Sequence, residues 1–266
     1  MSHFPYRQVD ETSDLATCSL ESQFVPRVHF TRKWNNEPRM RSGLYTIDPV
    51  SYVAEREERM TRHLDDFFWK CYFMLRMNRV HGDYLEFGCG SNVRSFRLAY
   101  KYMKLEYSAP RLFAFDSFEG LPAPQGVDSH PQWAKGNMAV STDMFRNIMR
   151  EMGARDNEYV MVPGFYDKSL DPRSPETYGV KRAAMVFVDC DLYESTVSVL
   201  NFVKDILSDG AVLAFDDWFC FNGDPAKGEQ RAFSEFREAH PHLRFSEYLK
   251  FGWHGNSFIM HADGTM

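Results

Sequence analysis

The sequence lacks the features that would place it in a membrane or outside the cell. No run approaches the roughly 20 consecutive apolar residues that a membrane-spanning helix needs. The first residues, MSHFPYRQVD, contain neither the basic nor the apolar segment of a signal peptide. The five cysteines are scattered and never fall into a Cys-x-x-Cys spacing: Cys18, Cys71, Cys89, Cys190 and Cys220. We therefore expect a soluble, cytoplasmic protein with free thiols and no membrane partner.

Positive charge is also scarce. Lysine and arginine together number 31 against 37 acidic residues, and the formal net charge is −6. Sequence-independent binding to the phosphates of a nucleic acid needs a basic surface, so we expect no nucleic-acid partner. Residues 27–41 are the exception, because positive charges outnumber negative ones there and could form a local basic patch. The composition favours a small-molecule ligand.

The chain is long enough for one sizeable core, with 266 residues of which 44% are hydrophobic. Residues 1–50 show little periodicity and several turn formers, and we interpret them as an irregular arm. Residues 51–266 then form the folded domain. From residue 52 to about residue 80, apolar residues recur at three-and-four spacing. This pattern predicts one or two amphipathic helices that lead into the core.

Short apolar runs follow at intervals, and their nearly continuous apolar character is typical of parallel strands buried on both faces. The predicted strands are 84–90, 111–117, 159–164, 184–191, 211–217, 243–249 and 257–261, with helices at 95–103, 141–152, 195–207 and 230–240. Because strands and helices alternate, we predict a doubly wound, mostly parallel α/β sheet of about seven strands. Only a glycine-containing turn separates the last two runs, which predicts a C-terminal antiparallel hairpin.

The first core strand ends in the motif EFGCGS (86–91). Ligands of open parallel sheets bind beyond the carboxyl ends of the strands. Gly88 and Gly90 would let the backbone approach such a ligand closely, and Glu86 offers a carboxylate to an amino group or hydroxyl. A dinucleotide is disfavoured because Gly-x-Gly-x-x-Gly needs glycine where this chain has Val93. We expect a ligand with a positive charge and a ribose; a plain glycine-rich turn is the alternative.

Asp116 ends the second core strand, in the run FAFD. An acid at this place is the usual way to hold ribose hydroxyls, because a carboxylate can accept from both. It lies 30 residues after Glu86, farther than the typical spacing of about 20. The alternative is a helix cap before Phe118.

Four aspartates follow two later strands, namely Asp189, Asp191, Asp216 and Asp217. Neighbouring parallel strands would bring these carboxylates together, where they repel each other unless a cation neutralises them. An all-oxygen set suits Mg²⁺ or Mn²⁺. The alternative is a group of capping and solvated loop acids.

Three longer motifs contain these residues: FDSFEGLP (115–122), VDCDLYEST (188–196) and FDDW (215–218). Here the chain resembles the macrocin-type (TylF family) sugar O-methyltransferases, which are class I S-adenosylmethionine-dependent enzymes with a Rossmann-like sheet. The resemblance spans about residues 80–262. It implies a cofactor site lined by Glu86, Gly88, Ser91, Asp116 and Ser117, with Gly164 near the adenine; Gly90 joins this set through its place in the turn. It also implies that Asp189, Asp216 and Asp217 hold a divalent ion against acceptor hydroxyls.

Methyl transfer requires that the acceptor oxygen lose its proton. We expect Asp191 to be the general base, because it lies two residues beyond a ligand and would face the same pocket in an extended strand end. Asp189 is the alternative if it is not a ligand, and His254 or His130 could also reach the acceptor. Residues 118–140 are too long and too rich in glycine and proline for a simple connector, and we interpret them as a lid rather than a plain surface excursion.

The sequence therefore predicts a metal-assisted O-methyltransferase acting on a sugar hydroxyl of a secondary metabolite or glycan. A methyltransferase for a catechol or another small diol would use the same metal chemistry. A non-catalytic binding protein on this fold is the third hypothesis, which the four aspartates disfavour. The acceptor, the methylated position and the oligomeric state, which could be a homo-oligomer, are left open.

Overall fold

The computed structural model describes residues 6–8, 45–47, 49–90, 92–106, 111–124, 126–128, 133–171 and 173–262. The chain divides into two units, Met1–Arg62 and His63–Met266. In the first unit, β1 (Tyr6–Gln8) pairs antiparallel with β2 (Tyr45–Ile47), and α1 (Pro49–Met77) begins. The sequence pattern does not predict this strand pair, and the rest of the expected arm lies outside the described residues. In the described part of the chain, no helix is both long enough and apolar enough to cross a membrane.

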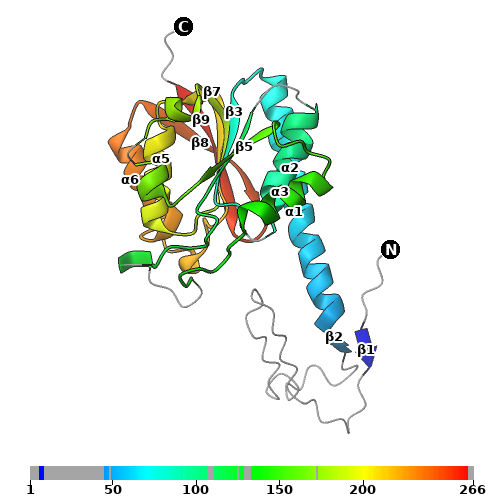
Figure 1. The fold of residues 1–266 in the computed structure, drawn as a ribbon. Coiled ribbons are helices and arrows are strands. Elements are labelled where there is room, and N and C mark those ends of the chain that lie inside the picture. Colours follow the sequence, from blue (N-terminus) through cyan, green and yellow to red (C-terminus); the bar gives the residue numbers. More distant parts are fainter. Residues whose placement is uncertain are drawn as a thin grey trace. The chain divides into compact units, whose positions relative to one another are not determined.

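A seven-stranded sheet forms the centre of the second unit (Figure 1). Its strands are β3 (Asp83–Phe87), β4 (Leu112–Asp116), β5 (Tyr159–Pro163), β6 (Ala183–Val188), β7 (Leu207–Phe215), β8 (Leu243–Phe251) and β9 (Gly255–Ala262). Their order is β5-β4-β3-β6-β7-β9-β8, with β3 to β7 parallel and β9 antiparallel to both β7 and β8. The strand order reverses between β3 and β6, which is where a doubly wound sheet binds its ligand.

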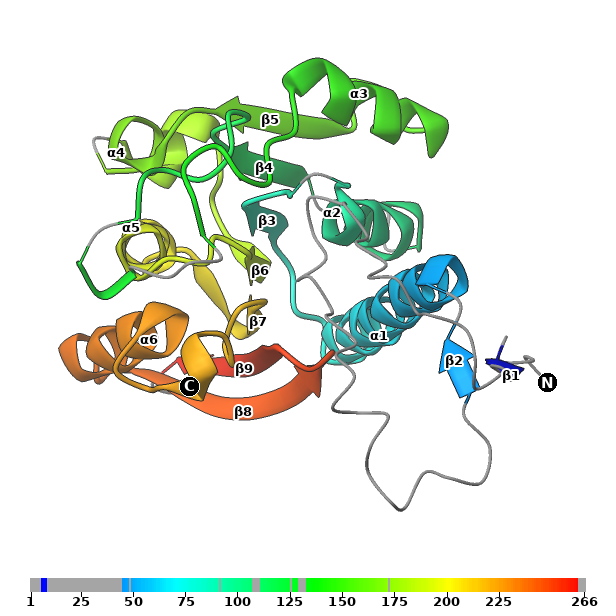
Figure 2. The ribbon, with the colours of Figure 1, turned by 90° about the horizontal axis from the view of Figure 1, so that it is seen from below.

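Helices cover both faces of this sheet (Figure 2). The second half of α1 lies on one face with α2 (Arg94–Ala99), a π-helical turn (Tyr100–Glu106) and α3 (Thr142–Glu151). The other face carries α4 (Tyr166–Ser169), α5 (Tyr193–Val203) and α6 (Gly228–Ala239). Short 3₁₀ turns occupy Gly126–Asp128, Pro175–Tyr178 and Phe221–Gly223. The predicted fold, including the C-terminal hairpin, is confirmed.

Alternate residues of each inner strand pack on opposite faces. Tyr84 and Phe187 belong to the core beneath α1 and α2, whereas Leu85 and Val188 belong to the core beneath α5 and α6. Because both faces are buried, these strands are almost entirely apolar, and polar residues collect toward the strand ends. The same constraint that makes the strands apolar therefore places the polar side chains at one edge of the sheet.

Some predicted boundaries are wrong. The helix expected to run to residue 207 ends at Val203, and β7 begins at Leu207 rather than at residue 211. Leu207 already pairs with Ala183, and an irregularity in register between Ala183 and Met185 accommodates the early start. The helix expected at 95–103 continues beyond α2 as the π-helical turn.

Candidate functional site

The glycine turn after β3 lies directly against the end of β6. Gly88 has φ +86°, and a Cβ built on it would lie 1.8 Å from the carbonyl oxygen of Asp189. Only glycine allows the two backbones to approach this closely. The contact lies at the point where the strand order reverses, so the turn sits at the expected ligand position.

Gly90 differs from Gly88 because it faces open space. Its φ is +57°, and a Cβ built on it would meet no atom within 4 Å. The neighbouring Val93 also has a positive φ, of 52°, just before α2. The turn thus presents backbone to an open region, which suits a bound ligand. Ser91, which we predict to bind the cofactor, lies outside the described residues.

Glu86 is fully buried and already hydrogen-bonded. One carboxylate oxygen accepts from the hydroxyl of Tyr84, and the other accepts from the hydroxyl of Ser95 at 2.8 Å. Burial raises its pKa from 4.5 to about 8, although both hydrogen bonds act in the opposite direction. A direct contact between Glu86 and a cofactor stays a prediction. The hydrogen bonds show that Glu86 also ties β3 to the start of α2.

Asp116 holds the turn in place from the next strand. Its carboxylate accepts from the backbone N–H of Cys89 at 2.7 Å and from that of Phe118 at 2.6 Å. The second bond closes a local turn and is not the helix cap expected as the alternative, because no helix begins at Phe118. The first bond links β4 to the glycine turn. Both oxygens retain lone pairs, so a ribose contact is compatible with this geometry.

Ser117 and Gly164 lie on the same side of the switch point. The Ser117 hydroxyl donates to the carbonyl of Gly120 at 2.8 Å, and the N–H of Gly164 donates to the carbonyl of Asp116 at 2.9 Å. With φ +132°, Gly164 turns the chain at the end of β5. The ends of β3, β4 and β5 thus bring together every described residue of the predicted cofactor set.

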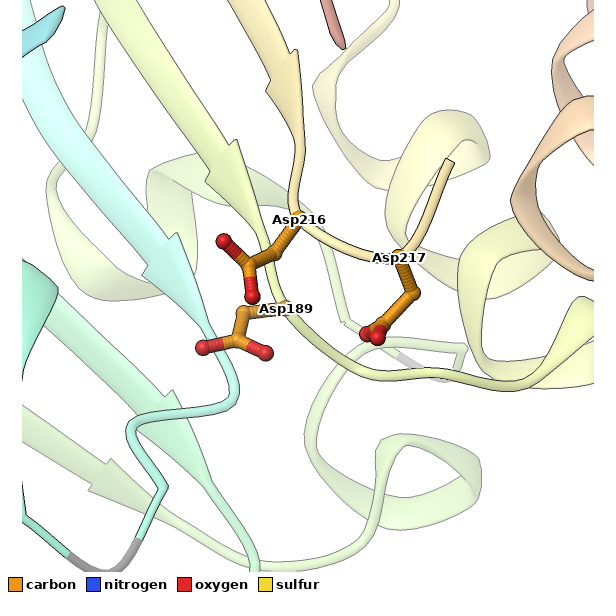
Figure 3. Close-up of side chains that lie close together, drawn as sticks. All are labelled: Asp189, Asp216 and Asp217. Carbon is orange, nitrogen blue, oxygen red and sulfur yellow. The ribbon is translucent and has the colours of Figure 1, made fainter. Parts of the chain in front are cut away.

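Three aspartates meet at the ends of β6 and β7. Asp189 follows β6, Asp216 and Asp217 follow β7, and Figure 3 shows the three side chains grouped around one space. One oxygen of each lies within 4.8 Å of the others. Neither Asp216 Oδ1 nor Asp217 Oδ2, both buried, has a hydrogen-bond partner among the described residues. These unpartnered oxygens fit the donor set that Mg²⁺ or Mn²⁺ requires.

Burial and mutual repulsion disfavour the charged forms of these aspartates. Burial raises the pKa of Asp189 well above its usual value, and the charges of Asp216 and Asp217 raise it further. Burial, followed by the charge of Asp216, raises the pKa of Asp217 to about 7. A divalent cation would relieve this repulsion and favour the ionised carboxylates.

Three further side chains surround the aspartates; sequence reasoning assigned neither Glu229 nor Cys220 to the site and considered His254 only as an alternative base. Glu229, on α6, accepts from the N–H of Asp217 at 2.9 Å, and the thiol of Cys220 donates to Asp217 Oδ1 at 3.2 Å. His254 Nδ1 lies 2.6 Å from the carbonyl oxygen of Asp216 and must be the donor there, because a carbonyl only accepts. Nothing in the sequence around Glu229 places that carboxylate beside Asp217.

Asp191 does not lie in an extended strand end, so that part of the prediction is wrong. β6 ends at Val188, and Asp191 has φ +59°, in the left-handed region. Burial raises the pKa of its carboxyl group well above the usual value and the nearby charge of Asp217 raises it further, so the group nevertheless lies at the aspartate cluster. Of the two histidines considered as bases, His254 contacts Asp216, whereas His130 lies outside the described residues.

Residues 39–243 match the family described as Macrocin-O-methyltransferase (TylF). The chain belongs to this family. A 4'-O-methyltransferase from Streptomyces olivaceus, named for 8-demethyl-8-(2,3-dimethoxy-alpha-L-rhamnosyl)-tetracenomycin-C, is 29% identical over 194 residues, which are 70% of this chain and 65% of the relative. The resemblance inferred from the motifs is thus confirmed, and the chain, which spans about 65% of the length of this relative, belongs to an O-methyltransferase family.

Solved structures support the fold of this TylF-family chain. The O-methyltransferase NovP has a TM-score of 0.59 at 20% identity, with 76% of this chain and 80% of NovP covered. The calicheamicin methyltransferase CalS11 also has a TM-score of 0.59, at 21% identity, with 85% of this chain and 87% of CalS11 covered. At these identities the likeness shows the fold. The roles of individual residues rest on the site geometry described above.

Proposed function

We propose that the protein is an S-adenosylmethionine-dependent, divalent-metal-assisted O-methyltransferase that acts on a sugar hydroxyl of a secondary metabolite or glycan. The observation that carries the proposal is the aspartate cluster, which lies beside an open glycine turn at the switch point of the sheet. The S. olivaceus relative, named for a rhamnosyl-bearing compound, supports the choice of a sugar. A catechol or small diol is the second candidate, since two neighbouring hydroxyls would meet the same cluster.

The cofactor would lie over the ends of β3, β4 and β5. Gly88 and Gly90 would offer backbone to it, Asp116 would accept from its ribose hydroxyls, and Gly164 would lie near its adenine. When bound, S-adenosylmethionine supplies a methyl group on a positively charged sulfur. Asp116 is the acid nearest to this ligand, and its ionised form would suit a cationic ligand.

Asp189, Asp216 and Asp217 would hold the divalent ion. When bound, such an ion lowers the pKa of a neighbouring hydroxyl and fixes its direction. Asp191 then accepts the proton of the acceptor hydroxyl, with Asp189 as the alternative if it is not a ligand. S-adenosylmethionine would supply the methyl group, exchanging its bond to sulfur for one to the acceptor oxygen and departing as S-adenosylhomocysteine, while Asp191 would keep the proton that this oxygen loses.

Residues 118–140 would cover the acceptor. This segment contacts the loop after β6, because Asp128 accepts from the N–H groups of Tyr193 and Glu194 at the start of α5. Trp253 lies 67% exposed in the turn between β8 and β9, with its ring 5.1 Å from that of His254. An exposed aromatic face beside the aspartate cluster could pack against a sugar ring. This segment and this turn would therefore select the acceptor.

The test compares methyl transfer to TDP-rhamnose, phenyl α-L-rhamnoside and catechol, with Mg²⁺ or with EDTA. Asp216→Asn should abolish turnover and weaken Mn²⁺ binding by roughly tenfold or more, while affinity for S-adenosylhomocysteine stays unchanged. Asp143→Asn removes the same charge from an exposed position on α3 and is the matched control. Unchanged Mn²⁺ binding and turnover in Asp216→Asn would refute the metal assignment.

A further inference from the structure

The backbone at Asp191 has an unfavourable conformation. Its φ of +59° lies in the left-handed region, and the N–H of Leu192 bonds back to the carbonyl of Cys190 at 2.6 Å, closing a three-residue turn around it. A residue other than glycine is strained in this region and persists there when its surroundings hold it. Something outside the turn must therefore fix Asp191.

Trp133 makes that contact from a distant part of the chain. Its indole Nε1–H donates to Asp191 Oδ1 across 58 positions of sequence. The indole is 5% exposed and stacks on Phe221, with ring centroids 4.5 Å apart and planes 17° apart. Together with Leu121 and Leu192 these rings form a small apolar cluster, separate from the two main cores. The cluster joins the loops that follow β4, β6 and β7.

The segment that carries Trp133 is itself closed. The N–H of Leu121 donates to the carbonyl of Asn137 and the N–H of Gly136 donates to that of Leu121, both at 2.9 Å. Gly120 permits this pairing, because a Cβ there would lie 2.5 Å from the carbonyl oxygen of Asn137. Two backbone hydrogen bonds therefore fix the segment that carries Trp133, and its indole packs against Phe221.

We propose that Trp133 is a positioning residue for Asp191; this inference rests on the proposed function. An indole has one donor and no acceptor, so it fixes a single carboxylate oxygen and leaves the other for the aspartate cluster and the acceptor. Without that bond the carboxyl group of Asp191 can rotate away from the acceptor proton. Trp133 thus acts on the rate of the proton-transfer step and not on binding of the cofactor.

Trp133→Phe tests the inference, because phenylalanine keeps the stacking on Phe221 and loses the N–H. The assay uses whichever of TDP-rhamnose, phenyl α-L-rhamnoside or catechol the wild-type enzyme methylates. We expect kcat to fall by roughly tenfold or more, the scale of a positioned proton transfer, while KM for the acceptor and Kd for S-adenosylhomocysteine change less than about twofold. Trp69→Phe, at a 46% exposed position on α1, is the matched control and should leave all three unchanged. Equal kcat in Trp133→Phe and wild type would overturn the proposal.

A second measurement does not need turnover. In a ¹H–¹⁵N spectrum, the five tryptophans give separate indole signals, and Trp133→Phe identifies the signal of Trp133. Asp191→Asn should shift that signal alone, since an amide is a weaker acceptor than a carboxylate. An unmoved signal would show that the contact does not exist and would overturn the inference. If instead the signal moves but no acceptor on the panel is methylated, the proposed function fails while the contact stands.

Discussion

Glu86→Gln should change how the stability of the protein depends on pH. The carboxylate of Glu86 is fully buried, and its pKa is raised from 4.5 to about 8. A folded-state pKa above the unfolded value means that the folded protein binds the proton more tightly. The stability that this proton supplies is complete below pH 4.5 and is lost as pH rises through about 8.

The size of this contribution to stability follows from the size of the pKa shift. One pKa unit corresponds to about 1.4 kcal/mol, so a rise from 4.5 to about 8 corresponds to at most about 5 kcal/mol of stability. Glutamine is nearly isosteric and stays neutral, and the hydroxyls of Tyr84 and Ser95 can each donate or accept. The variant should therefore keep the hydrogen bonds and lose the pH-dependent contribution.

Urea unfolding at about pH 5 and about pH 9, in EDTA, measures the effect. Other buried acids, among them Asp116 and Asp217, contribute to the slope of both proteins, so the difference between wild type and variant isolates Glu86. The variant should gain stability relative to wild type by several kcal/mol between the two pH values. A difference that does not change with pH would refute the conclusion that Glu86 is buried and neutral.

Three other substitutions test the residues that bind the cofactor or fix the backbone around the site. Asp116→Ala should weaken S-adenosylhomocysteine binding by roughly 1–3 kcal/mol in calorimetry, the scale of a lost charge-assisted hydrogen bond; unchanged affinity would place the ribose elsewhere. Gly88→Ala should destabilise the fold by more than about 2 kcal/mol in urea unfolding, because its Cβ would overlap the carbonyl of Asp189. Asp128→Ala should cost about 0.5–2 kcal/mol through the lost cap of α5, and a variant as stable as wild type would show that the cap contributes nothing.

The sequence was most informative where one physical rule controls a long stretch. Strands buried on both faces must be continuously apolar, so the inner strands were found from their runs, and their ends located the polar residues. Asp189 and Asp216 could be paired in advance because one strand-helix-strand unit separates them and neighbouring parallel strands share an edge. The closing hairpin was equally clear, since one short turn separates its two strands.

What escaped prediction depends on contacts between distant segments. Nothing near Trp133 in the sequence indicates that its indole reaches Asp191, and nothing in α6 indicates that Glu229 binds the backbone of Asp217. The backbone turn at Asp191 was missed because a left-handed aspartate leaves no pattern in the residues around it. The hydrogen bonds of Glu86 with Tyr84 and Ser95 were also missed, because they depend on side-chain orientation rather than on spacing.

We infer that the carboxyl edge of the sheet binds S-adenosylmethionine beside a divalent ion. Calorimetric titration with S-adenosylmethionine and S-adenosylhomocysteine, each with and without Mg²⁺, tests it most directly. We predict micromolar binding of both compounds by the wild type and weaker binding by Asp116→Ala. If the wild-type protein binds neither compound, with or without Mg²⁺, the account is contradicted and a non-catalytic role on this fold becomes the leading explanation.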